Sequence, residues 1–231
     1  MTEQNYHFGI RVNLHQFVHQ LWQVLLVGLT LGMMRTVVPA LAESEFGVPK
    51  GSFLLLMAFV VAFGFVKGTL NFVAGRLSER IGRKHVLMLG WLIALPIPAM
   101  IFYAPSWNWI VFATVLLGVN QGLTWSMTQT AKLDITHPEQ RGLTIGLNEF
   151  SGYFGVALAG IITAYLSEWL GAREGLMWFG MLTVIVAIIT TQLWVKDTLA
   201  WAKAEARHHA SGKASGPKPR FPGNISDTPT T

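Results

Sequence analysis

Six apolar segments, each about twenty residues long, constrain this chain more than any other feature of its sequence. They cover 17–41, 52–74, 85–103, 107–131, 143–166 and 176–195. A helix of about 20 mainly apolar residues spans the roughly 30 Å hydrocarbon core of a bilayer. The sequence therefore predicts an all-α polytopic membrane protein with six transmembrane helices.

Composition agrees with a protein that faces lipid. Hydrophobic residues make up 52% of the 231 residues and charged residues only 13%, which is too apolar for an ordinary soluble domain. The net charge of +5 comes from short segments between the apolar runs, so we expect no nucleic-acid partner. Cysteine is absent, which excludes disulfides and thiolate chemistry. No motif for catalysis or nucleotide binding is present, so we expect neither an enzyme nor a cofactor.

The distribution of Lys and Arg predicts the orientation of the six helices. With 1–16 placed in the cytoplasm as a lead-in, only Lys50 and Arg173 of the 17 cationic residues fall in outside segments. Cations concentrate on the cytoplasmic side of membrane helices, so we expect both termini in the cytoplasm of a bacterial inner-membrane protein. The rest of the chain is expected to form a six-helix domain, an amphipathic cytoplasmic linker helix and a disordered polar tail, at 17–195, 196–210 and 211–231.

A glycine-containing basic motif lies between the second and third predicted helices. It runs from Gly75 to Lys84 with the sequence G-R-L-S-E-R-I-G-R-K, and it resembles the signature loop of the major facilitator superfamily, Gly-x-Leu-x-Asp-Arg-x-Gly-Arg-Arg/Lys. The matching positions are Gly75, Leu77, Arg80, Gly82, Arg83 and Lys84, with Glu79 at the acidic position. The resemblance implies a cytoplasmic gate, in which the acid and the cations pair with each other and with helix ends.

The resemblance extends over about 17–197 and implies one half of a transporter. Members of the family normally have two six-helix halves, each made of two three-helix inverted repeats. We therefore expect the N-terminal half of a secondary transporter that moves a small molecule by alternating access. The linker-like tail favours a truncated product; a separately encoded partner and a second copy of the chain are the other possible sources of the second half. The alternative function is a non-transporting membrane sensor or assembly scaffold that retains the six-helix fold.

Three charged residues lie within the predicted spans, where charge is costly and usually faces a bundle interior or a water-filled cavity. Arg35 could attract an anionic substrate group or extend its charge to the membrane interface. Lys67 and Glu149 both lie about 12 Å from the inner face, so they could pair. The family resemblance implies a buried pair or a protonatable Glu149 near the inner gate, and a static stabilising ion pair is the other interpretation.

A strip of polar residues follows the fourth predicted helix toward its inner end. Its members are Asn120, Gln121, Trp125, Lys132 and Asp134. Positions 121, 125 and 132 recur at near-helical spacing, so this face could be wet and could line a substrate or ion pathway. Hydrogen bonding between helices explains the same pattern equally well.

Other signals are interpreted as structural. Glycines spaced four apart at Gly28–Gly32, Gly64–Gly68 and Gly118–Gly122 predict closely packed helices. His15 and His19 fall one turn apart, but two imidazoles near a membrane interface are more often ordinary polar residues than metal ligands. We therefore expect no metal site.

Overall fold

All the regular elements that the structure describes are helices. The structure is a computed structural model that describes residues 6–48 and 53–215, with side chains left undescribed at 53–59 and 208–215. Its helices are α1 (Leu14–Ser44), α2 (Phe53–Ile81), α3 (Arg83–Ala94), α4 (Ile97–Phe102), α5 (Trp107–Asp134), the 3-10 turn η1 (Pro138–Gln140), α6 (Arg141–Leu170), α7 (Ala172–Trp194) and α8 (Leu199–Ser215). Six helical segments are long and apolar enough to span a membrane, with α3 and α4 together forming the third. The predicted all-α fold with six spans is confirmed, and residues 216–231 of the predicted tail lie outside the described residues.

The helices extend beyond the apolar segments predicted from the sequence. The second helix ends at Ile81 instead of residue 74, and the fifth membrane helix, α6, runs from Arg141 to Leu170. Hydropathy detects only the part of a helix that lies in hydrocarbon, whereas the backbone hydrogen bonds continue through polar residues at the ends. The predicted boundaries are therefore too short by several residues.

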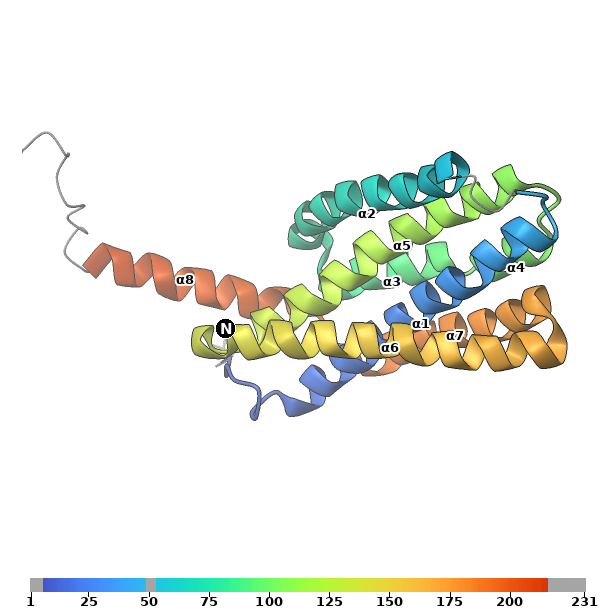
Figure 1. The fold of residues 1–231 in the computed structure, drawn as a ribbon. Helices are drawn as coiled ribbons and strands as arrows, with labels where there is room; N and C mark the ends of the chain where they lie inside the picture. Colours follow the sequence, from blue (N-terminus) through green and yellow to red (C-terminus); the bar gives the residue numbers. More distant parts are fainter. Residues whose placement is uncertain (1–5, 49–52, 216–231) are drawn as a thin grey trace, which may run out of the picture.

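The helices pair in a pattern that repeats within the bundle. Helix α1 packs most extensively on α6, and α2 packs on α5 (Figure 1). Helix α3 packs on α5, and α7 packs on α1. These pairs are related by a two-fold exchange of α1 with α5, α2 with α6 and the α3–α4 span with α7. Such a relation is expected of two three-helix inverted repeats.

Tight connections define the two ends of the bundle. Gly82 joins α2 to α3 and Gly171 joins α6 to α7, each with φ of +96°, a conformation that favours glycine. Pro96 separates α3 from α4 within the third span, because proline has no N–H to continue the helical hydrogen bonding. We call the end at Gly82 the α2–α3 end, and the opposite end the α1–α2 end. The α2–α3 end also holds the start of α1, the end of α7 and α8 (Figure 1).

Glycines allow two helix crossings to be very close. Gly28 and Gly32 of α1 face α6, and a Cβ atom on Gly28 would clash with the carbonyl oxygen of Gly152. Gly118 and Gly122 of α5 face α2 in the same way. Small residues are used in this manner where membrane helices pack backbone to backbone, so these two glycine pairs act as the sequence predicted.

A buried amide joins three helices in the core. Gln23 of α1 is 1% exposed, and its Nε2 donates a hydrogen bond to Thr190 Oγ1 at 2.8 Å. Its Oε1 accepts hydrogen bonds from Trp91 Nε1 at 2.9 Å and from Thr191 Oγ1 at 3.0 Å. Polar groups in hydrocarbon require such internal partners, so this amide fixes α1 against α3 and α7.

Candidate functional site

A charged and aromatic cluster lies where α2, α5 and α6 approach one another. The indole Nε1 of Trp125 donates a hydrogen bond of 2.9 Å to Glu149 Oε1. The Nζ atom of Lys67 lies 4.6 Å from the centroid of the Trp125 ring, which is within cation–π range. Trp125 is 8% exposed, whereas Lys67 and Glu149 are partly exposed. We call these three residues the central cluster.

Two further residues of α6 support the central cluster. Asn148 is buried, and its Nδ2 donates a second hydrogen bond to Glu149 Oε1 at 3.0 Å. The Tyr153 ring packs edge-on against Trp125 at 5.7 Å and is 57% exposed. No sequence motif singles out either residue. Tyr153 lies one helical turn after Glu149, so projecting helical spacing from that charge would have found it.

The direct ion pair between Lys67 and Glu149, which the sequence suggested, is not formed. Both side chains are described, and the ion pairs of the bundle do not include this one. Helix α2 packs on α5, and each charge instead contacts the indole of Trp125. The aromatic ring contacts the cation through its face and the carboxylate through its N–H edge.

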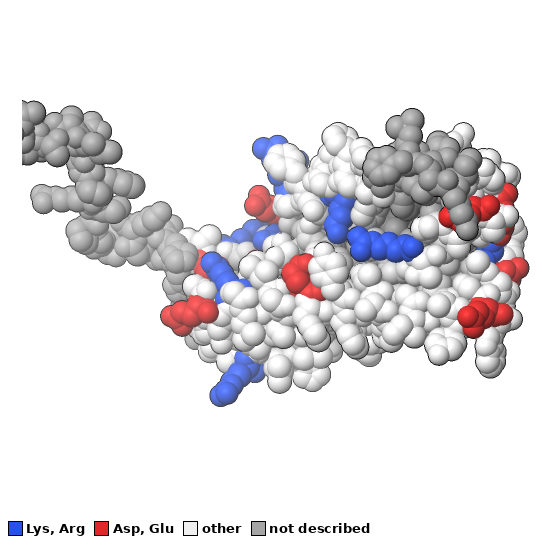
Figure 2. All heavy atoms as spheres, viewed as in Figure 1, with Lys and Arg blue, Asp and Glu red and all other residues white. Residues whose placement is uncertain are grey.

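Arg35 adds a second cation beside the cluster. Its side chain is exposed on α1, and its charge is close enough to Lys67 to repel it. Among the described residues, no hydrogen bond or ion pair holds its guanidinium group. Figure 2 shows basic and acidic groups midway along the face between α2 and α6, away from the two ends of the bundle. This open face therefore presents charge of both signs to whatever covers it.

The polar strip on α5 is largely buried within this six-helix unit. Asn120 and Gln121 are both 0% exposed. Asn120 Nδ2 donates to Gly90 O at 2.9 Å, and Gln121 Nε2 donates to Val27 O at 3.0 Å. These two side chains therefore form hydrogen bonds between helices, α5 to α3 and α5 to α1.

Lys132 also lies inside the bundle and not on the open face. It is 0% exposed, and its Nζ donates to the backbone oxygen of Gln20 on α1 at 3.2 Å. No carboxylate lies within ion-pair distance of this ammonium group in the described part of the chain. Its position therefore differs from the pathway position that the sequence suggested, because α1 covers this face of α5.

Asp134 belongs to a group of polar contacts at the α2–α3 end, which we call the polar lock. Arg83 Nε and Asp134 Oδ2 form a buried ion pair of 2.8 Å, and Thr198 Oγ1 donates to the same oxygen at 2.7 Å. The backbone N–H of Lys84 donates to Asp197 Oδ2 at 3.0 Å. These contacts join the α2–α3 connection to the end of α5 and to the entry to α8.

Most of the Gly75–Lys84 motif is helical and not a loop. Helix α2 continues to Ile81, and Gly82 is the single residue between α2 and α3. The side chains of Glu79 and Arg80 are exposed, whereas those of the residues just after Gly82 bind within the bundle. The motif therefore combines exposed charged side chains with residues of the polar lock.

Metal ligation has no support in the described part of the chain. The rings of His15 and His19 contact each other edge to face at 5.2 Å. Among the residues that the structure describes, no group of three or more His, Asp or Glu side chains could hold a metal ion. The two histidines instead belong to a surface at the end of α7, where His19 stacks on Trp194.

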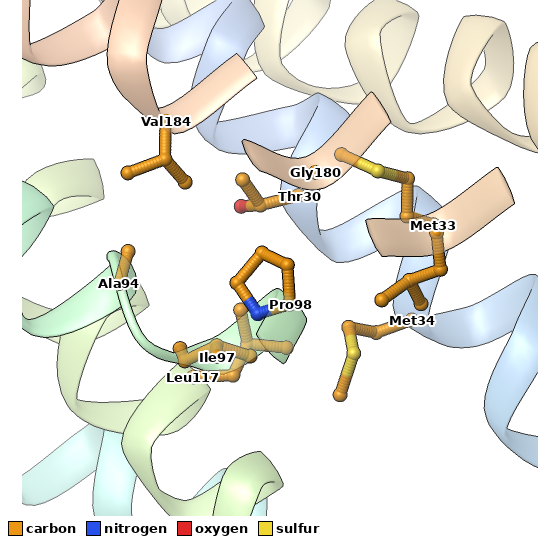
Figure 3. Close-up of a pocket in the computed structure, with 10 residues that line it drawn as sticks. Thr30, Met33, Met34, Ala94, Ile97, Pro98, Leu117, Gly180 and Val184 are labelled. Atoms are coloured by element: carbon orange, nitrogen blue, oxygen red, sulfur yellow. The ribbon is translucent and has the colours of Figure 1, made fainter. Parts of the chain in front are cut away.

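A small apolar pocket lies where α4 packs on α1 and α7 (Figure 3). Its volume is about 20 Å³, and its lining includes Met33, Met34, Pro98 and Val184. The hydroxyl of Thr30, which also lines it, already donates to a backbone carbonyl of α1. A dry apolar space of this size holds at most about one water molecule, so it is a packing feature and not a substrate site.

A bundle of six membrane-length helices with charged groups on one open face defines an integral membrane protein. Comparison of the sequence with protein families specifies its class. The model of the Major Facilitator Superfamily matches residues 21–226. The chain therefore belongs to this superfamily of transporters, as its signature motif predicted.

Two curated relatives are transporters and not enzymes, in agreement with the sequence prediction. The chain is 25% identical over 194 residues to the probable 4-methylmuconolactone transporter of Cupriavidus pinatubonensis, covering 83% of this chain and 41% of that protein. It is 28% identical over 188 residues to the galactose-proton symporter of Escherichia coli K12, covering 79% of this chain and 38% of the symporter. The chain thus spans about 40% of the length of these relatives.

The fold is similar to that of a solved transporter. The crystal structure of the human organic anion transporter MFSD10 (TETRAN) matches with a TM-score of 0.65 at 16% sequence identity. The match covers 80% of this chain and 48% of the human protein. At this identity the comparison establishes the fold alone, and it agrees with a single six-helix unit.

Proposed function

We propose that the chain is one six-helix half of a secondary transporter and that the central cluster lies on its substrate or ion pathway. The observation that carries the proposal is the position of Lys67 and Glu149 beside the open face between α2 and α6, where Lys67 contacts the ring face of Trp125 and Glu149 accepts from its indole N–H. Partly exposed charges at this depth are costly in lipid and have a use where they face a water-filled cavity. A second six-helix unit would complete such a cavity.

The surface around the cluster supports the need for a second unit. Helices α2 and α6 also carry exposed aromatic side chains: Phe65, Phe72, Phe150 and Phe154 are 76%, 68%, 67% and 51% exposed. Mixed aromatic and charged surface is suited neither to lipid nor to water alone, but it suits a protein interface with a wet centre. The second unit would be the continuation of a longer polypeptide, a separate chain or a second copy.

We further propose that the α2–α3 end is cytoplasmic and forms a gate in a bacterial inner membrane. The exposed Glu79 and Arg80 of the motif would contact the second unit, while Arg83 holds the gate region to its own half. The chain has no cysteine, so single cysteines report topology directly. A membrane-impermeant maleimide applied to intact cells should label Glu45→Cys and not Arg80→Cys.

The substrate is proposed to be a small organic solute. The relatives named above suggest galactose and 4-methylmuconolactone as first compounds to test, and Arg35 and Lys67 would favour an anionic group on the solute. The assay is uptake of labelled compounds by vesicles that contain the chain with its second unit. Lys67→Gln and Glu149→Gln should each abolish uptake, whereas Lys203→Gln, an exposed cation on α8, should leave it unchanged.

The assembly itself can be tested without knowing the substrate. A photoactivatable cross-linker attached to a cysteine at Phe150 on the open face should link the chain to its second unit, and an added thiol oxidant should join two such cysteines in a disulfide if the transporter is a homodimer. A cysteine at Leu182, which is 61% exposed on α7, is the matched control on a surface that faces lipid. Full uptake by a variant with apolar residues at both Lys67 and Glu149 would contradict the pathway proposal and favour a scaffold.

A further inference from the structure

A pocket at the α2–α3 end is separate from the central cluster and shares no residue with it. It has a volume of about 350 Å³ and lies where the start of α1 meets the end of α7 and the start of α8. Its lining includes two imidazoles, two indoles and an ammonium group, from His15, His19, Trp194, Trp201 and Lys196. No acidic side chain lines it among the described residues, so its charge is positive or neutral.

Hydrogen bonds hold the walls of this pocket in place. His19 Nδ1 lies 3.1 Å from the backbone oxygen of Trp194, to which Gln16 Nε2 also donates at 2.8 Å. Gln16 Oε1 in turn accepts from the backbone N–H of Lys196 at 2.8 Å. The His19 ring stacks on the Trp194 indole at 5.4 Å. The last turn of α7 is therefore tied to α1, while the ammonium group of Lys196 is exposed and has no ion-pair partner within the described residues.

Apolar side chains lead from the membrane-facing surface into the pocket. On α7, Ile185, Ile189 and Leu193 are 42%, 50% and 71% exposed, and their spacing of four places them on one face of the helix. Leu193, the last of the three, lines the pocket. On α1, Val18 and Trp22 are 50% and 38% exposed beside the same region. The pocket thus lies at the end of an apolar surface that extends about 12 Å along α7, most of the roughly 15 Å hydrocarbon depth of one bilayer leaflet.

We propose that this pocket binds the phosphate headgroup of an anionic phospholipid whose acyl chains lie along α7 and α1. Indole side chains are common at the depth of lipid headgroups, and a lysine at this depth attracts anionic lipids. A soluble phosphate ion would make use of Lys196 but not of the adjoining apolar surface, so the combination favours a lipid. The absence of an acidic lining residue among those described favours an anionic headgroup over a zwitterionic one.

The test is native mass spectrometry of the full chain in detergent, with added phosphatidylglycerol or phosphatidylcholine of identical acyl chains. We expect the chain to retain phosphatidylglycerol more strongly. Lys196→Gln should weaken that binding about five-fold, and His15→Gln, a second exposed lining residue, should weaken it in the same direction. The matched control is Lys203→Gln, which removes the same charge from α8 outside the pocket and should change binding less than about two-fold.

Three results would overturn the proposal. Equal retention of the two lipids would show that the headgroup charge is not recognised. Equal loss in Lys196→Gln and Lys203→Gln would show general attraction to the basic surface instead of a site. Displacement of phosphatidylglycerol by millimolar inorganic phosphate, but not by chloride at equal ionic strength, would assign the pocket to a soluble anion.

Discussion

The indole nitrogen of Trp125 and the carboxylate of Glu149 are joined by a hydrogen bond of 2.9 Å, which links α5 to α6 beside the open face of the bundle. The same indole ring carries the ammonium group of Lys67 on its face. One aromatic side chain therefore holds a cation and an anion from two different helices. Loss of either charge would remove one of the two contacts through which Trp125 on α5 binds a neighbouring helix.

The first prediction concerns the coupling between these two residues. Trp125→Phe removes the N–H donor but keeps an aromatic ring for Lys67, and Glu149→Met removes the acceptor. A double-mutant cycle measured by unfolding in mixed micelles should give a coupling free energy of about 1 kcal/mol, near the upper range for hydrogen bonds between membrane helices. Trp178→Phe, at an indole that is 68% exposed on α7, should have no measurable effect. Strictly additive single changes would contradict the interaction.

The sequence predicted the six spans and the family because both depend on local patterns. Apolar length fixes the number of membrane helices, and the motif at Gly75–Lys84 depends on the order of a few residues. Helical spacing also placed Gln121, Trp125 and Lys132 on one face of α5. It did not show that α1 and α6 cover this face, because periodicity gives no information about which neighbour a face contacts. Two lysines in similar apolar surroundings, Lys67 and Lys132, consequently have opposite exposure.

Long-range contacts of the helix ends were equally hidden from the sequence. Arg173 was recognised only as a cation between two spans. In the structure its Nε pairs with Glu45 Oε2 at 2.7 Å, and its Nη1 donates to the backbone oxygens of Ile101, Phe102 and Ala104. These carbonyls lie where the third span ends and helical hydrogen bonding stops, and a guanidinium group can bind several at once. Only the fold brings residues so far apart in the chain together.

The second prediction separates two arginines of the same motif. Arg83 is buried in an ion pair with Asp134, so Arg83→Met leaves a buried carboxylate without its partner and should lower the free energy of unfolding by about 3–5 kcal/mol. Arg80 is exposed, and Arg80→Met should change it by less than about 0.5 kcal/mol. Unfolding of the isolated chain in detergent measures both. Equal destabilisation by the two substitutions would show that the lock at Asp134 is not formed.

The third prediction concerns the buried Lys132. Among the described residues, its ammonium group donates one hydrogen bond, to a backbone oxygen of α1. Removing the charge should therefore cost little stability. Lys132→Met keeps the approximate volume of the side chain and should leave the free energy of unfolding unchanged or raise it by about 1 kcal/mol. Asp134→Leu is the contrasting variant, because it leaves Arg83 buried and unpaired and should be strongly destabilising. A loss of more than about 1 kcal/mol in Lys132→Met would indicate a stabilising partner for the ammonium group.

The fourth prediction tests the helix crossings with glycine pairs that look alike in the sequence. Gly28 of α1 packs on the backbone of α6, so Gly28→Ala forces the two helices apart and should lower the free energy of unfolding by about 1–3 kcal/mol. Gly68 of α2 belongs to the same kind of small-residue pair, but a Cβ atom there meets no described atom within 4 Å. Gly68→Ala should therefore be neutral or stabilise the isolated chain by up to about 1 kcal/mol, since alanine favours a helix over glycine.

The behaviour of Gly68→Ala after assembly shows whether Gly68 contacts the second six-helix unit. Gly68 is exposed on α2, one residue after Lys67, and small residues on an open helix face permit close contact with another helix. If the second six-helix unit packs there, Gly68→Ala should be harmless in the isolated chain yet should weaken cross-linking through a cysteine at Phe150. Unchanged cross-linking would place the contact elsewhere on the face. Destabilisation of the isolated chain equal to that of Gly28→Ala would instead show that α2 is already covered within this half.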